Sequence, residues 1–189
     1  MVVIACGALA KEIMALKRLN GWNFELTCVP AQLHNRPEKI TGAVEKKLLE
    51  AKARGEKVFV AFADCGTGGQ LDALLEQHEV ERLAGAHCYE FFAGTDVFMN
   101  LHDEEPGTLY LTDFLARHFE ALVIEGLGIN KHPQLFDLYF GNYKRVVYLA
   151  QTDNSDYLVR AQAAAERSVT SAASSLPPKQ LVSPAMHRS

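Results

Sequence analysis

Long apolar runs and an excess of positive charge are both missing from this sequence of 189 residues. No run reaches the ~18–20 apolar residues that a membrane-spanning helix needs, so we expect no membrane association. The formal net charge of −4 and a pI near 6.0 argue against a nucleic-acid partner, because surfaces that bind nucleic acids are normally basic. The N-terminus MVVIACGALAKE lacks the basic region of a signal peptide, so we expect a cytoplasmic protein.

The chain contains no CxxC pair among its four cysteines. With no sign of export, the cysteines are expected to be reduced thiols rather than a disulfide framework. The hydrophobic fraction of 48% and the charged fraction of 22% are ordinary for a globular protein that buries a core.

Apolar runs that suit strands alternate with segments of helical periodicity. This alternation predicts an α/β fold, with a three-layer, mostly parallel, doubly wound sheet that has helices on both faces. We predict one domain over 1–167 and a disordered tail rich in Ser, Ala and Pro over 168–189. The segment 108–111 could be a strand or the lead-in to a helix. The expected strands are 2–6, 23–29, 57–63, 80–83 and 145–150, and the expected helices are 8–19, 38–54, 70–78, 88–101, 113–125, 132–140 and 156–167.

Three cysteines fall where such a fold would gather side chains at one end of its sheet. Cys6 and Cys65 each end an apolar run, and Cys88 follows the weaker run before it. Ligands bind outside the carboxyl ends of parallel strands, and thiolates suit zinc or iron–sulfur centres. Three thiolates fit a zinc ion with an open position or a four-iron cluster with one free iron. The alternative is that they are small buried apolar residues, which is how we interpret Cys28.

The turn that follows the run at 57–63 is rich in glycine. The amides of Gly66, Thr67 and Gly68 could face an anionic substrate at the start of the next helix. The same position would lower the pKa of Cys65 and favour a thiolate. An ordinary strand-to-helix turn explains the glycines equally well.

Four further side chains could take part in chemistry near these cysteines. His87 and Glu90 flank Cys88 and could move protons. His34 and Arg36 lie in a polar loop and would suit a small anionic substrate, Arg36 through a bidentate contact. A structural role remains open for each of them.

Four separated blocks of the sequence, IACGALAKE, LHNRPEKI, ADCGTGG and HCYEFFAG, resemble the bacterial and archaeal family called domain of unknown function 1638. The resemblance covers roughly 2–165 and supplies no established reaction. It implies that the candidate cysteines and histidines fall in signature blocks, and it suggests anaerobic metallochemistry, sometimes beside corrinoid methyltransferases.

Three hypotheses follow. The first is a zinc or iron–sulfur site held by Cys6, Cys65 and Cys88, used in lyase, hydrolase, methyl-transfer or sulfur-transfer chemistry on a small anionic molecule. The second is a metal-free enzyme with Cys65 as nucleophile and His87 as base. The third is a non-enzymatic accessory or carrier protein for a corrinoid or metallo-enzyme system. The sequence leaves open whether the protein is an enzyme and whether it has a protein partner.

Overall fold

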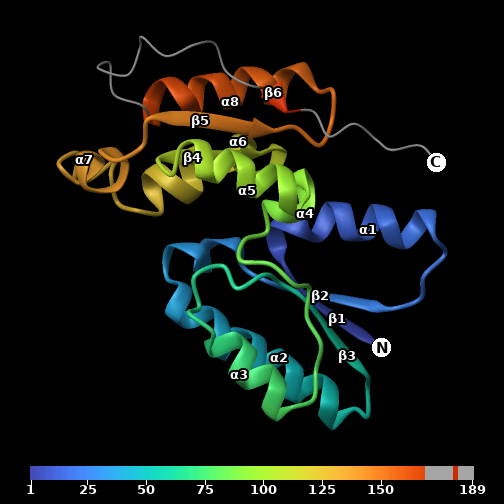
Figure 1. Ribbon diagram of the computed structural model, residues 1–189. Coiled ribbons are helices and arrows are strands. Elements are labelled where there is room, and N and C mark those ends of the chain that lie inside the picture. The colour runs from blue at the N-terminus through green and yellow to red at the C-terminus, as the bar shows by residue number, and fades with distance from the viewer. Residues whose placement is uncertain (169–180, 183–189) are drawn as a thin grey trace. The chain divides into compact units, whose positions relative to one another are not determined.

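The computed structural model describes residues 1–168 and 181–182, and the chain divides into two compact units, Met1–Cys88 and Tyr89–Ser189 (Figure 1). The α/β class is confirmed, because each unit combines a parallel sheet with helices. In the described residues the strands form two three-stranded sheets, one in each unit. The single domain over 1–167 stays a prediction, since compactness does not show whether the units fold independently. In the described part of the chain, no helix is both long and apolar enough to cross a membrane.

In the first unit, β1 (Val2–Cys6) lies between β2 (Glu25–Val29) and β3 (Val58–Ala61), and both pairings are parallel. All residues of β1 are buried, because the central strand of a parallel sheet is covered on both faces. The pairing brings the carboxyl ends of the three strands to one edge of the sheet.

Helices cover both faces of this sheet, as the sequence predicted (Figure 1). On one face, Ile13 of α1 (Ala10–Leu19) packs with Val3 and Ala5. On the other face, α2 (Ile40–Ala53) buries Ile40 and Val44, and α3 (Gln70–Gln77) packs beside α2. Short 3₁₀ turns, η1 (Gly7–Leu9), η2 (Ala31–Asn35) and η3 (Pro37–Lys39), lead from β1 and β2 into α1 and α2.

Residues 81–86 run beside β3 without forming a regular strand. The predicted strand at 80–83 is reduced to one parallel bridge between Val60 and Arg82. The Val60 amide donates to the Glu81 carbonyl, and the Leu83 amide donates to the Val60 carbonyl, both at 3.0 Å. These bonds align the segment with β3 and direct it toward the carboxyl edge.

The second unit contains a parallel sheet in the order β4 (Thr108–Thr112), β5 (Arg145–Leu149), β6 (Leu181–Val182). The ambiguous segment 108–111 is therefore a strand. Gly94, with φ of 79°, divides the helix predicted over 88–101. The Thr112 hydroxyl caps the next helix, as predicted, by accepting from the Leu115 amide at 3.2 Å. The helical elements are α4 (Glu90–Ala93), α5 (Thr95–Glu104), α6 (Asp113–Phe119), the π-helical η4 (Glu120–Glu125), α7 (Leu135–Phe140) and α8 (Ser155–Ser168).

Parts of the predicted tail have regular structure. Ser168 is buried as the last residue of α8, and its hydroxyl donates to the Ala164 carbonyl at 2.6 Å. Leu181 pairs with Tyr148 in the β5–β6 ladder. The other residues of the tail, 169–180 and 183–189, lie outside the described residues.

A buried carboxylate joins the carboxyl ends of β4 and β5. Asp113, 3% exposed, accepts from the Tyr148 hydroxyl at 2.6 Å, the Thr152 hydroxyl at 2.6 Å and the Gln151 amide at 3.1 Å. The Asp113 amide in turn donates to the Gln151 side chain at 2.8 Å. Burial, with the nearby Asp113 carboxylate, raises the pKa of Tyr148, so this phenol remains a donor.

We predict that Tyr148→Phe lowers the free energy of unfolding by about 1–2 kcal/mol, because the buried Asp113 carboxylate loses one donor. Urea unfolding followed by circular dichroism measures the change. Tyr139→Phe is the matched control, since Tyr139 is 41% exposed on α7. Equal unfolding midpoints for the two variants would contradict the prediction.

Candidate metal centre

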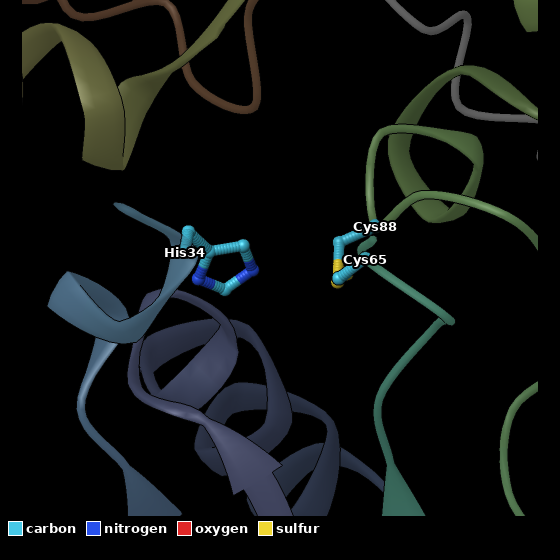
Figure 2. Close-up of side chains that lie close together, drawn as sticks. All are labelled: His34, Cys65 and Cys88. Carbon is cyan, nitrogen blue, oxygen red and sulfur yellow. The ribbon is translucent and has the colours of Figure 1, made fainter. Parts of the chain in front are cut away.

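The carboxyl edge of the first sheet gathers His34, Cys65 and Cys88 (Figure 2). His34 lies in η2, which follows β2, and Cys65 lies in the turn after β3. Cys88 follows the segment that runs beside β3. All three residues belong to the first unit.

The three side chains place one donor atom each within 4.8 Å of the others. The two sulfurs are in contact, with Cys65 Sγ 3.2 Å from Cys88 Sγ. Figure 2 shows the imidazole ring of His34 turned toward the two cysteines. Two sulfurs on a tetrahedral zinc ion lie about 3.8 Å apart, given Zn–S bonds of about 2.3 Å, so small side-chain movements would accommodate the ion.

His34 is held in an orientation that suits a metal ligand. Its Nδ1 lies 3.0 Å from the Ala31 carbonyl oxygen, and its ring stacks on the fully buried Phe62 with centroids 6.0 Å apart. A carbonyl can only accept, so Nδ1 carries the hydrogen and the lone pair of the neutral ring is on Nε2. Metal-binding histidines commonly have this arrangement.

Asp64 organises the turn that carries Cys65. Its carboxylate accepts from the Gly66, Gly68 and Gly69 amides at 3.2, 3.3 and 3.0 Å, and from the Thr67 hydroxyl at 2.5 Å. The hydrogen bonds within the turn lower the pKa of Asp64, outweighing the opposing effect of desolvation. The turn thus holds an ionised carboxylate at its centre.

Cys65 has a backbone conformation that residues other than glycine rarely adopt. Its φ is 50°, in the left-handed region. The backbone is secured on the other side by the segment that carries Cys88, because the Asp64 and Cys65 amides donate to the Gly85 and Ala86 carbonyls at 3.1 and 2.9 Å. This strained geometry sets the direction in which the Cys65 side chain leaves the turn.

Arg82 fixes the segment before Cys88. Its guanidinium binds the Asp72 carboxylate of α3 through two bonds, at 2.5 and 2.9 Å. It also donates to the Leu83 and Gly85 carbonyls at 2.7 and 3.3 Å. The planar guanidinium therefore ties the segment to α3 with two bonds and makes two more bonds within the segment itself.

The pKa values of the two contacting thiols shift in opposite directions. The hydrogen bond with Cys88, together with burial, raises the pKa of Cys65, and the hydrogen bond from Cys65 lowers the pKa of Cys88. Either sulfur can be the donor in this contact, and Cys88 is the thiol whose pKa the contact lowers. The raised pKa of Cys65 is the opposite of the lowered pKa that the sequence predicted for it, and α3 begins only at Gln70. Desolvation acts to lower the pKa of His34, but its bonds to Cys65 and the backbone raise it overall.

Cys6, the third predicted ligand, is outside the group of three donors. It is 1% exposed at the end of β1, and its sulfur accepts from the Ala8 amide at 3.4 Å. Burial raises the pKa of Cys6 to about 12, so its thiol stays protonated. His34, which the sequence assigned to substrate binding, is in the donor group instead.

The other predicted site residues are not part of this group. The predicted anion-binding amides of Gly66 and Gly68, like the Thr67 hydroxyl, already bind Asp64, so the structure gives that prediction no support. His87 and Arg36 are exposed, and Glu90 is a buried residue of the second unit. Their predicted roles stay predictions.

Sequence reasoning also missed residues that position the donors. Asp64 and Arg82 were not predicted to organise the turns, although an acidic residue before a glycine-rich turn is a common signal for such bonding. The place of His34 beside the two cysteines could have been inferred from its position after a strand, since parallel strands share their carboxyl edge.

The chain matches the family described as "Protein of unknown function (DUF1638)" over residues 28–170, and it belongs to that family. The matched region contains His34, Cys65 and Cys88, whereas Cys6 lies before it. The comparisons with curated proteins and with solved structures found no match.

We predict that Asp64→Asn destabilises the protein at pH 7 by about 1–3 kcal/mol, because an amide cannot accept all the bonds that the carboxylate accepts. The pKa of Asp64 is lowered in the folded chain, so its contribution is full above the ordinary value of 3.8 and is lost as pH falls through the folded-state pKa. The difference in urea midpoint between wild type and variant should therefore shrink below about pH 4.

Asp153→Asn is the control for this prediction, since Asp153 is exposed. A difference between wild type and Asp64→Asn that stays constant from pH 7 to about pH 3 would show that the carboxylate charge does not hold the turn.

Proposed function

We propose that the protein binds one zinc ion through His34 Nε2, Cys65 Sγ and Cys88 Sγ. The convergence of these three donors from separate segments carries the proposal. Two thiolates and one imidazole form a borderline-soft ligand set that suits zinc. The hydrogen bond from His34 Nδ1 to Ala31 supports it further, because it fixes the tautomer that a metal requires.

A mononuclear site is favoured over a four-iron cluster. Each cysteine of such a cluster binds a different iron atom, so the sulfurs are separated by the cluster itself. Cys65 and Cys88 are in contact at 3.2 Å, which suits two ligands of one ion. Binding would release the thiol protons, because thiolates are the ligands.

Three protein ligands leave a fourth position on a tetrahedral zinc ion, as in catalytic rather than structural zinc sites. A bound zinc ion would act there as a Lewis acid toward a small molecule. We propose hydrolase or lyase chemistry on an anionic substrate, with Arg36, exposed two residues after His34, as its counter-charge. The protein residues hold the ion and position the substrate beside it.

The prediction is about one zinc ion per chain, measured by mass spectrometry of the metal in purified protein and by titration of the chelator-treated chain. Cobalt in place of zinc should give the absorption of a thiolate-to-metal transition. Cys65→Ser, Cys88→Ser and His34→Ala should each weaken binding at least about 10-fold. Cys28→Ser, a half-buried cysteine of β2, is the matched control and should bind normally.

Cys6→Ser separates this site from the three-cysteine site that the sequence predicted. Loss of metal in Cys6→Ser with retention in His34→Ala would overturn our assignment. Iron with acid-labile sulfide would do the same in favour of a cluster. A chain that binds no metal after anaerobic purification and zinc titration would refute the proposal.

One observation favours a second function, a metal-free cysteine enzyme. The Cys65 thiol and the His34 imidazole place their donor atoms within 4.8 Å, and His34 acts to lower the Cys65 pKa, although Cys88 and burial raise it overall. In this alternative His34, rather than the exposed His87, is the base. Activity that survives chelation and is lost in Cys65→Ser would identify it.

A further inference from the structure

The contact between Cys65 and Cys88 has a chemical consequence besides metal binding. Their sulfurs are 3.2 Å apart, and a disulfide requires about 2.05 Å, so a closure of about 1.2 Å joins them. Side-chain rotation and small adjustments of two surface turns supply movements of this size. Cys6 by contrast accepts from the Ala8 amide, and Cys28 lies within β2.

Hydrogen bonds of the protein itself hold together the two segments that carry the thiols. The Cys65 amide donates to the Ala86 carbonyl, and Arg82 ties the segment before Cys88 to α3. A pair held in this way has a high effective concentration, which favours the closing step of disulfide formation.

We propose that the metal-free protein forms a reversible Cys65–Cys88 disulfide, and that oxidation and zinc binding exclude each other because they use the same two sulfurs. The formation of the disulfide is independent of the proposed function. Its competition with zinc rests on that function. The pair would therefore release the metal under oxidising conditions and recover it on reduction.

The oxidant is a low-molecular-weight disulfide. Cys88 is the more exposed residue of the pair, because Cys65 is only 9% exposed, so we assign the first attack on the small disulfide to the Cys88 thiolate. One thiol of the reagent leaves, and a mixed disulfide forms at Cys88. The Cys65 thiolate then attacks Cys88 Sγ and expels the second thiol. The protein loses two hydrogens, and the reagent disulfide is reduced to two thiols.

The test uses the chelator-treated full chain with oxidised glutathione, followed by acid quenching, alkylation and trypsin. Cleavage after Lys57, Arg82 and Arg117 leaves Cys65 in peptide 58–82 and Cys88 in peptide 83–117. We expect these peptides to be joined by a disulfide that dithiothreitol reverses. Separate peptides that are fully alkylated, a stable glutathione adduct, or a link to Cys6, Cys28 or a second chain would overturn the proposal.

Two variants and one ligand separate this proposal from the zinc site. Cys28→Ser should still form the link. His34→Ala should also form it although it has lost a metal ligand. Zinc at about 100 times its dissociation constant should slow the reaction about 100-fold in the wild type, because only about 1% of the chains are then metal-free.

The outcomes differ for the two ideas. Zinc binding without any peptide link refutes the disulfide and leaves the metal site. A disulfide that forms equally fast with zinc present refutes the competition but leaves the disulfide proposal standing. If the chain also binds no metal under these conditions, the zinc site is refuted as well.

Discussion

The parallel pairing of β1 with both β2 and β3 is the constraint on which the candidate site depends. Three strands that run in one direction must end at one edge, and the chain that leaves each strand begins its turn there. The 3₁₀ turn with His34 follows β2, and the turn with Cys65 follows β3. Residues 81–86 run beside β3 through similar hydrogen bonds, so Cys88, which follows them, also lies at this edge.

Two charged side chains that are not among the three candidate metal ligands fix the backbone at this edge of the sheet. Asp64 collects the amides of its own turn, and Arg82 joins α3 to the segment before Cys88. Each ion forms several directed bonds with the backbone, so the chain conformation is set before any ligand arrives. The amides of the glycine-rich turn bind a carboxylate of the protein itself.

Apolar pattern predicted much of the fold and part of the site. The buried run at 2–6 is β1, the run at 57–63 contains all of β3, and the cysteine that follows the second run is in the donor group. Pattern could not show which strands pair, since an apolar strand suits either sheet, so the division into two sheets was missed. The sequence could not show that His34 faces the two cysteines, because the direction of its side chain in the 3₁₀ turn depends on contacts with Ala31 and Phe62.

The wide spacing of the metal-donor residues along the chain bears on whether a metal would bind before or after the chain folds. Cys65 and Cys88 are 23 residues apart, and His34 precedes Cys65 by about thirty. An ion that met the unfolded chain would have to close two long loops, which opposes early capture. Small zinc domains differ, because their folding is driven by the metal. If the chain binds zinc as proposed, we expect the sheet to assemble first and the ion to stabilise a chain that is already folded.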